Sequence, residues 1–482
     1  MKKNTFTLSV IRITVLSFML GIGIFITSSA SAATITYNPT TGNWTDANWT
    51  PQAPVAGDNI VIPAGAVVTL STDAGININS LSVLGTLNIT SSGVLSVRQT
   101  VTTNPLVSVG GGVISNAGTF SIFQTLANSN TAIKFVNGTD ADAKFANTGT
   151  LNIDMMASTI ASSSTNCINL AQTTATRTCR FTLGGILNFA VPDGTRFFEL
   201  SSGTNGVIDG TTVFGSTLNY KNWRLIHMGN SGTLTLAGNI EFYSGYTNAT
   251  NGTISMSISA TNSAVGNLVN SGTLKIHGGP TVVAYGIYLN PQYATAAPLT
   301  SGTANFTNQG TLLIDGNFPL GTILLNGSTG TSASFNNSLG AIAKLTNSGT
   351  GASAVPLKAS ATASTIVNNA GTLNLSGTAL DATINTTKNT YTNTGTVNFN
   401  VSTEVGKVIG FNGKIYAIGN DIYVNLVSDA SSVLQLTDMT GRLIKQITVK
   451  GQNNVINAAS LKGVFIARLI TAEGIYSQKI IL

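Results

Sequence analysis

The chain has 482 residues, of which 42% are hydrophobic and only 8% are charged, against about 25% charged residues in ordinary domains. Regularly spaced apolar residues exclude a disordered chain, and 51 glycines beside abundant Thr, Asn and Ser indicate an all-β protein with uncharged turns. The formal net charge of +6 falls to +3 without the basic N-terminal segment, so nucleic acid is not a predicted partner.

The N-terminus has the features of a secretory signal. Lys2, Lys3 and Arg12 precede an apolar run of 14 residues, Ile13 to Ile26, and Ala30-Ser31-Ala32 resembles a cleavage site. The run is shorter than the ~20 residues that span a bilayer. We therefore predict a signal peptide over residues 1–32, passage through the Sec translocon, and a mature chain that begins at Ala33.

Residues 33–60 carry two of the three tryptophans, Trp44 and Trp49. Large rings suit the open apolar end of a stack of coils, so we interpret this stretch as a cap; an aromatic platform for a ligand is the alternative. The order Gly42-Asn43-Trp44, Trp49 and Gly57-Asp58 also resembles the opening of secreted bacterial β-helix proteins.

Residues 61–403 repeat one pattern: apolar, any, Asn, any, Gly, Thr, apolar, any, apolar, as in Tyr391 to Phe399. Asn and Gly tolerate the left-handed backbone of a tight turn, and Thr suits the start of a strand. Stacked turns would let the Asn amides bond as a ladder. Full copies centre on Asn116, Asn147, Asn230, Asn270, Asn308, Asn347, Asn369 and Asn393.

The spacing of the copies predicts a parallel β-helix. From Asn230 the steps are 40, 38, 39, 22 and 24 residues. We expect each short step to be one coil, and each long step to be two coils or one coil with a loop. Separate β-sandwiches would show domain boundaries about every hundred residues, and none is seen before residue 404.

Two cysteines, Cys167 and Cys179, lie close together in the sequence. In an oxidising compartment a disulfide between them is predicted, with two buried thiols as the alternative. Two cysteines and two distant histidines do not make a metal-ligand set, so no metal or cofactor is predicted.

Residues 404–482 are denser in charge and alternate as short strands, which predicts a small antiparallel β-sandwich. The segments Leu436 to Ile444 and Leu461 to Arg468, and the terminal Lys479-Ile-Ile-Leu482, resemble the C-terminal sorting domain of type IX secretion cargo in Bacteroidota. The residues that carry this resemblance are Asp438, Gly441, Arg442, Gly463 and Lys479. The resemblance implies export by the type IX machinery, followed by release or by anchoring on surface lipopolysaccharide.

Candidate catalytic groups are sparse. Asp140 and Asp142 suit a solvated turn better than a calcium site, and Asp193, Arg196 and Glu199 suit a surface ion pair better than an acid–base site. The segment Trp223 to His227, with Tyr220 nearby, could form a sugar platform or a packed loop. We assign no catalytic residue.

Two function classes remain. The first is a non-enzymatic protein of the cell surface or the medium, an adhesin, matrix or display protein that contacts glycans or other cells. The second is a secreted polysaccharide-active enzyme or carbohydrate-binding module on the same scaffold. The low charge and the absence of an acid cluster in the sequence favour the first.

Overall fold

The computed structural model describes residues 32–482 apart from 39–40, 129, 137–140, 159–164, 172–176, 202, 230, 250, 258–263, 283, 292–300, 327–329, 350–352, 360–363, 378–388, 400–413, 419, 427–430, 439–441 and 472–473. The predicted signal peptide, except Ala32, lies outside these residues, as do Asn230, Asp140 and Gly441. The chain divides into two compact units near Asn398.

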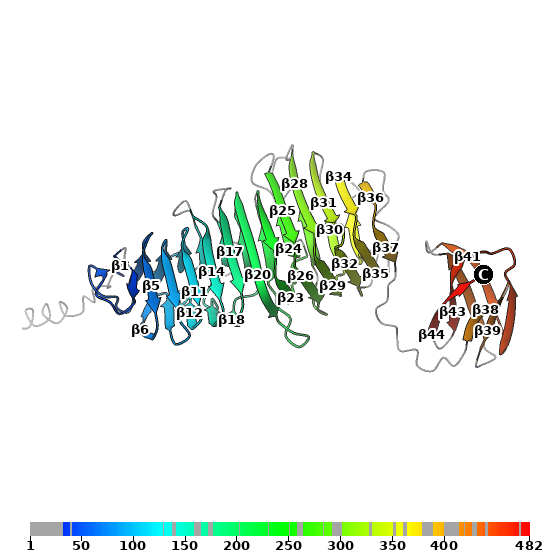
Figure 1. Cartoon of the computed structure of the whole chain (residues 1–482), viewed down its shortest axis with the longest axis horizontal. Coiled ribbons are helices and arrows are strands. Elements are labelled where there is room, and N and C mark those ends of the chain that lie inside the picture. The colour runs from blue at the N-terminus through cyan, green and yellow to red at the C-terminus, as the bar shows by residue number, and fades with distance from the viewer. Residues whose placement is uncertain are drawn as a thin grey trace, which may run out of the picture. The chain divides into compact units, whose positions relative to one another are not determined.

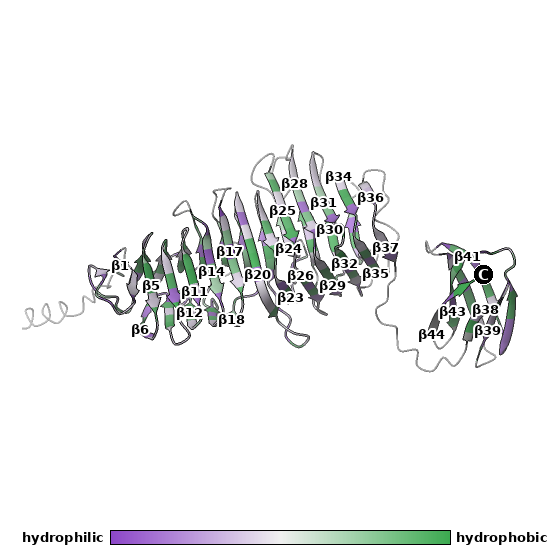
Figure 2. Cartoon of the chain, viewed as in Figure 1, coloured by the Kyte–Doolittle hydropathy of each residue, from purple (hydrophilic) through white to green (hydrophobic). Residues whose placement is uncertain are grey.

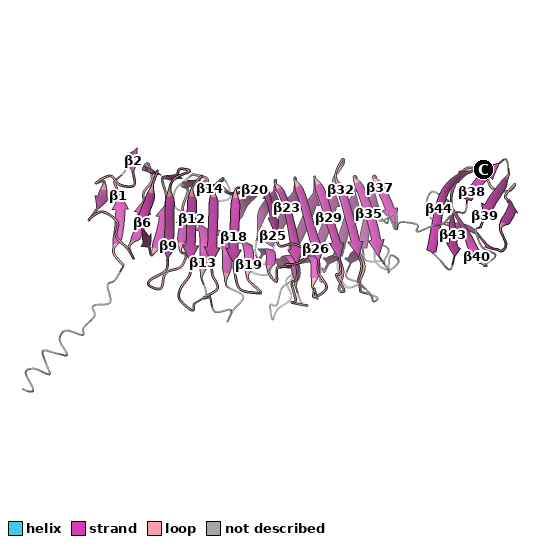
Figure 3. Ribbon diagram, turned by 90° about the horizontal axis from the view of Figure 1, so that it is seen from below, coloured by secondary structure: helices cyan, strands magenta, loops and turns pink. Residues whose placement is uncertain are grey.

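The first unit is a parallel β-helix, as predicted (Figure 1). Every regular element of the described chain is a strand (Figure 3). Each full coil contributes strands to three successive faces, and neighbouring coils pair in parallel. The first face is one 13-stranded sheet: β3 (Trp49–Thr50), β1 (Thr34–Tyr37), β4 (Asn59–Ile62), β7 (Ser80–Val83), β10 (Val107–Val109), β13 (Thr131–Phe135), β16 (Asn166–Leu170), β19 (Arg196–Leu200), β21 (Arg224–Met228), β24 (Gly252–Ser257), β27 (Tyr285–Asn290), β30 (Ile323–Leu325) and β33 (Leu357–Ala359).

The second face is continuous along the same unit. Its strands are β2 (Thr41–Asn43), β5 (Val67–Leu70), β8 (Thr86–Ile89), β11 (Val113–Asn116), β14 (Ala143–Asn147), β17 (Thr178–Leu183), β20 (Thr204–Phe214), β22 (Gly232–Leu236), β25 (Ala264–Asn270), β28 (Gly302–Asn308), β31 (Thr331–Asn337), β34 (Ser364–Asn369) and β36 (Asn389–Asn393).

The third face is split into two sheets. The first contains β6 (Asp73–Ile78), β9 (Val94–Arg98), β12 (Thr119–Phe123), β15 (Thr150–Asp154) and β18 (Ile186–Ala190). The second begins with the last residues of β20 and continues through β23 (Asn239–Ser244), β26 (Thr273–Gly278), β29 (Thr311–Gly316), β32 (Ile342–Asn347), β35 (Thr372–Gly377) and β37 (Thr396–Phe399).

Apolar and polar residues are interspersed along the strands of the β-helix (Figure 2), and the buried apolar ones fill its bore. On the first face one row runs in register through successive coils and is buried in each: Ile35, Ile60, Leu81, Val107, Ile133, Ile168, Phe198, Ile226, Ile254, Ile287, Ile323 and Leu357. Burial of each such side chain stabilises the fold by about 1.5–3 kcal/mol. A single coil cannot bury this row, so the coils depend on their neighbours.

The tryptophans of the first coil are buried. Trp44 and Trp49 are each 5% exposed, their ring centroids lie 5.1 Å apart, and Trp49 also packs on Tyr37. The indole Nε1 of Trp49 donates to the carbonyl of Trp44 at 2.8 Å. The rings therefore pack into the end of the stack and do not form an exposed platform.

The predicted asparagine ladder is present. Asn270 donates from Nδ2 to Oδ1 of Asn308 at 2.8 Å, and Asn308, Asn337 and Asn369 each donate to the next rung at 2.8 Å, ending at Asn393. Asn116 donates in the same way to Asn147 at 2.6 Å. Each donor amide also reaches a backbone carbonyl of the next coil, as from Asn270 to Thr311 at 3.0 Å. The ladder thus ties together side chains and backbone across successive coils.

One predicted rung was wrong. Asn337 occupies the ladder position between Asn308 and Asn369, whereas Asn347 ends β32 on the third face. There its Nδ2 donates to the carbonyl of Phe318 at 2.8 Å, and its Oδ1 accepts from the Gly349 N–H at 2.9 Å. Asn337 was not recognised as a rung from the sequence, because Asn337-Ser338-Leu339-Gly340 departs from the Asn-any-Gly-Thr spacing.

The register tests the steps between the predicted copies. Asn270 pairs directly with Asn308, so the 38-residue step is one coil and not two. The 24-residue step from Asn369 to Asn393 is also one coil. The 39- and 22-residue steps on either side of Asn347 are not coil lengths, because Asn308 pairs with Asn337 and Asn337 pairs with Asn369.

The two cysteines lie on different faces, Cys167 in β16 and Cys179 in β17. Both are buried, and no disulfide joins them, which differs from the predicted bridge. Burial in apolar surroundings raises the pKa of the Cys167 thiol far above its usual value.

The second unit contains a three-stranded and a four-stranded antiparallel sheet, in agreement with the predicted sandwich. Its core includes Ile422, Val424, Leu434, Leu436 and Leu469. The strands are β38 (Lys414–Ile418), β39 (Asp421–Asn425) and β42 (Asn453–Asn457) in one sheet, and β41 (Leu443–Val449), β40 (Ser432–Asp438), β43 (Val464–Thr471) and β44 (Gly474–Ile481) in the other.

Candidate functional site

A groove opens where the third face splits. It has a volume of about 490 Å³ and lies between β18 and the last residues of β20. Its lining includes Asn152, Asp154, Asn188, Val213, Lys221 and Trp223. Val213, in its lining, is 57% exposed.

A two-residue shift of the turn explains the groove. On the second face Phe145, Phe181, Ile208, Leu236 and Asn270 are in register. In the later coil the turn to the third face begins at Asn270 itself, which lies in this row. In the earlier coil it begins at Asn147, two residues after Phe145, the member of the row in that coil. The chain therefore leaves the second face two residues earlier from Ile208 onward, and β20 starts the third face out of line with β18.

Aromatic side chains fill the bore beneath the groove. The ring of Phe197 stacks on Trp223 with centroids 5.3 Å apart and packs against Phe214 at 4.9 Å and Phe189 at 4.8 Å. Phe189 also contacts Phe214 across the split, at 5.8 Å. The packing of these rings joins the two halves of the stack at the position where neighbouring strands of the third face do not pair.

The rim of the groove is polar. The amide of Asn188 donates to Asn152 at 2.8 Å, and Asn152 donates to Ser121 at 2.9 Å, so a second amide row ends at the groove. On the opposite side the Lys221 ammonium lies 5.3 Å from the ring centre of Trp223. The site thus combines an apolar floor with amide, carboxylate and ammonium groups at its edge.

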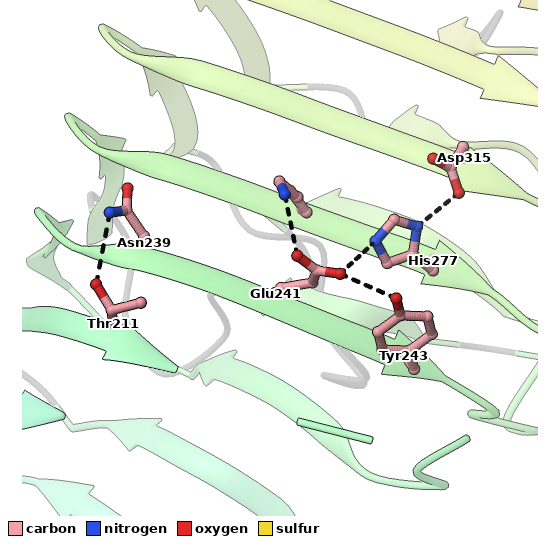
Figure 4. Close-up of polar contacts among 7 residues, drawn as sticks. Thr211, Asn239, Glu241, Tyr243, His277 and Asp315 are labelled. Carbon is pink, nitrogen blue, oxygen red and sulfur yellow. Dashed lines mark hydrogen bonds and ion pairs between the residues drawn. The ribbon is translucent and has the colours of Figure 1, made fainter. Parts of the chain in front are cut away.

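Beyond the groove, the second half of the third face carries a charged cluster of Glu241, Tyr243, Lys275, His277 and Asp315 (Figure 4). His277 lies between two carboxylates, with Nδ1 2.8 Å from Asp315 and Nε2 3.3 Å from Glu241. Glu241 also accepts from Lys275 at 3.0 Å and from the Tyr243 hydroxyl at 2.9 Å. The Tyr243 and His277 rings stack at 4.5 Å.

These contacts fix the charges of the cluster. The hydrogen bond to Asp315 raises the pKa of His277. Burial opposes ionisation of Glu241, but hydrogen bonds from Lys275 and Tyr243 outweigh it and lower the pKa of that carboxyl. The bond to Glu241 raises the pKa of Tyr243. At neutral pH Glu241 is therefore an ionised acceptor and not a proton donor.

A second cluster lies on the first face. Arg196 contacts Glu199 at 3.2 Å, and His227 Nδ1 lies 2.7 Å from the other oxygen of Glu199. The predicted surface ion pair is instead buried, because Glu199 is 8% exposed and His227 is 4% exposed. Desolvation lowers the pKa of His227 despite the neighbouring carboxylate. Asp193 is exposed in the preceding turn.

The segment from Tyr220 to His227 belongs largely to the interior. Trp223 is 4% exposed and Leu225 is 1% exposed, so the indole is packed and is not a sugar platform. Arg224 donates to the Tyr246 hydroxyl at 3.0 Å, within the same buried region. Register between β19 and β21 brings this segment against the Arg196 to Leu200 strand. Both segments were identified as unusual from the sequence, but their pairing as neighbouring strands was not predicted.

The remaining predicted residues have structural contacts. Asp142 accepts from the Thr178 N–H at 2.9 Å. In the second unit, Asp438 at the end of β40 accepts from Arg442 at 3.1 Å, and Gly463 exchanges backbone hydrogen bonds with Leu482 at 2.9 and 3.0 Å. Lys479 pairs with Ile466 on β43. No group of three potential metal ligands occurs among the described residues.

A scan against protein-family models found no match for this chain, and a search of curated proteins found none either. Within the described part of the chain, no helix is long and apolar enough to cross a membrane.

Proposed function

We propose that this chain is an exported, non-enzymatic β-helix protein of the cell surface or the extracellular medium, with adhesive, matrix or display function. The β-helix presents rows of uncharged amides and hydroxyls on its outer faces, such as Asn267, Asn305 and Ser334 on the second face. These rows are held by contacts between coils and need no ligand for their order. Such a surface suits contact with glycans or with other cells.

The observation that carries this proposal is the state of the carboxylates. In the charged cluster of the third face, Glu241 already accepts from Lys275 and Tyr243, and Asp315 is bonded to His277. General acid catalysis needs a carboxyl group that holds a proton near neutral pH, whereas the pKa of Glu241 is lowered. The cluster therefore supports a structural role better than hydrolysis.

The proposed location rests on the C-terminal unit. Its sequence resembles a type IX sorting domain, and its last residues end in an ordered strand, with Leu482 bonded to Gly463. We infer that this unit is the export signal and that the N-terminal segment directs the chain through the Sec translocon. Surface lipopolysaccharide is then the proposed anchor where the protein is retained.

The second candidate function is a polysaccharide-active enzyme. It is favoured by one arrangement, the imidazole of His277 between the Glu241 and Asp315 carboxylates beside the Tyr243 ring. A sugar that displaced the internal hydrogen bonds of this cluster would meet a base, a cation and an aromatic face.

Incubation of the purified protein with a panel of polysaccharides distinguishes the two. We measure new reducing ends and unsaturated products, and we expect neither. Turnover that Glu241→Gln abolishes, while the control Asp209→Asn on the second face leaves it intact, would overturn the non-enzymatic proposal. Binding to glycans or cells without turnover would support it.

A further inference from the structure

The step between the two parts of the third face uncovers side chains that are buried in the preceding coil. Leu187 and Phe189 pair in register with Leu151 and Ile153. The two earlier side chains are buried, whereas Leu187 and Phe189 are only half-buried. Val213 also lines the groove and is exposed. The groove therefore has an apolar wall that is open to solvent, as small-molecule sites commonly do.

A row of polar side chains on the outer surface ends at this groove. The row runs in register through Asn77, Ser96, Ser121, Asn152 and Asn188. Asn188 donates to Asn152, but no described residue donates to Oδ1 of Asn188, which is exposed on the last strand of the sheet. A hydroxyl group bound in the groove would extend the row by one hydrogen bond.

Two opposite charges line the groove, and neither has an ionic partner. Oδ1 of Asp154 accepts from the Met156 N–H at 3.0 Å, and the Lys221 ammonium lies over the Trp223 ring. Neither group takes part in an ion pair within the part of the chain that the structure describes. The lining is thus neutral overall and offers both a carboxylate acceptor and an ammonium donor.

These three groups favour a ligand that is rich in hydroxyls. A hydroxyl donates to a carboxylate or an amide oxygen and accepts from an ammonium group, so it suits Asp154, Asn188 and Lys221 alike. An anionic ligand would be attracted by Lys221 but repelled by Asp154, and a cationic ligand would meet the reverse. The volume of about 490 Å³ lies within the ~300–1,000 Å³ of small-molecule sites.

We propose that the groove binds a neutral oligosaccharide. The C–H groups of a sugar ring would lie against Phe189 and Val213, and its hydroxyls would bond to Asp154, Asn188 and Lys221. A sugar that lies over the step needs no opening between the two coils. This inference rests on the proposed contact with glycans and names the place where that contact is made.

Isothermal titration calorimetry of the purified full chain tests this proposal with defined probes. The neutral probes are maltotriose, cellotriose, mannotriose, xylotriose and chitotriose. Trigalacturonic acid is the anionic comparison, and triglycine is the zwitterionic one. We expect saturable binding of at least one neutral trisaccharide, and weaker binding or none of the two charged probes.

The carboxylate is tested by Asp154→Asn. Hydrogen bonds to a charged group are the stronger ones, so this variant should bind the same trisaccharide about tenfold more weakly. The matched control is Asp73→Asn. Oδ1 of Asp73 accepts from the N–H two residues further on, as Oδ1 of Asp154 does, but Asp73 lies in β6 at the far end of the same sheet.

The end of the amide row is tested by Asn188→Ala, which should weaken binding about fivefold. Its control, Asn77→Ala, removes an exposed amide at the opposite end of the same row. Neither control should change the affinity. Circular dichroism should show the same folded state for all four variants.

Unchanged affinity in both groove variants would overturn the proposal and assign the sugar to another part of the β-helix. Preference for trigalacturonic acid or triglycine would overturn it too, because the groove would then select a charged ligand. Binding of none of the trisaccharides would also overturn it. Adhesion of the protein to whole cells is measured separately, and adhesion that persists in any of these cases would leave the proposed function standing.

Discussion

Asn308 shows how one side chain supports three coils. It is fully buried, accepts from Asn270, and donates to Asn337 at 2.8 Å and to the Ile342 carbonyl at 3.0 Å. A buried amide with all of these partners stabilises the turn, and its loss leaves polar groups of two neighbouring coils without a partner.

Asn308→Ala should lower the free energy of unfolding by about 2–3 kcal/mol, because the hydrogen bonds are lost in a buried setting. The matched control is Asn305→Ala, which removes a half-buried amide from the outer row of the same strand and should cost less than about 1 kcal/mol. Urea unfolding followed by circular dichroism measures both. Equal losses would contradict a special role of the buried ladder.

The two histidines should respond to pH in opposite directions. The pKa of His277 is raised, so its protonation favours the folded state; this stabilisation is present below the unfolded pKa of about 6.5 and is lost as pH rises through the folded value. Burial lowers the pKa of His227, so its protonation opposes folding as pH falls.

His277→Asn should therefore lower the melting temperature more at pH 5.5 than at pH 8.5. His227→Asn should show the reverse trend, since the variant no longer pays for burial of an imidazolium at low pH. Thermal melts of both variants and the parent at the two values check this. A His277→Asn effect that is independent of pH would refute the ionic role of the cluster.

Glycine at the turn is a requirement of close stacking. Gly210 has a φ of +88°, and a Cβ there would overlap the carbonyl oxygen of Leu183 in the preceding coil. Gly65 has a similar φ of +82° but meets no atom within 4 Å. Substitutions at these two glycines therefore distinguish the cost of backbone strain alone from the added cost of a clash between coils.

Gly65→Ala should cost about 1–2 kcal/mol, the strain of a left-handed alanine. Gly210→Ala should cost more, because the backbone of two coils must also move apart beside the groove. Chemical denaturation gives the two losses, and hydrogen exchange of β17 and β20 locates them. If both substitutions cost the same, the turns are not packed as described.

The repeat made the fold predictable, and the breaks in the repeat did not reveal the site. The Asn-any-Gly-Thr turns and the alternating apolar residues follow from local backbone and burial preferences, so the coils and the ladder could be predicted. Asn347 was misplaced because its local pattern is right although its tertiary register is not. The groove arises from a two-residue shift between β17 and β20, and the only local signal is that Leu183, Ile208 and Leu236 replace asparagine at successive turns.

The charged cluster of the third face was also missed. Glu241, His277 and Asp315 are 36 and 38 residues apart in sequence and meet only because β23, β26 and β29 stack in register. Coil length varies with the loops, so sequence distance alone does not predict which charges become neighbours. By contrast, Asp438 and Arg442 are four residues apart in sequence, and their contact follows from this local spacing.

The two units divide the proposed work between them. The β-helix provides a long, nearly uncharged surface and the groove, while the small antiparallel unit has its own core. Because that core contains only residues of the second unit, removal of this unit should leave the stack of coils folded. The proposed export role of the second unit can therefore be tested without unfolding the β-helix.

The most direct test expresses the full chain and a truncation that ends at residue 403 in a bacterium with a type IX system. Surface protein is measured by protease treatment of intact cells, with periplasmic and medium fractions assayed in parallel. We predict that the full chain reaches the surface or the medium and that the truncation, still folded, remains in the periplasm. Normal surface exposure of the truncation would contradict the account.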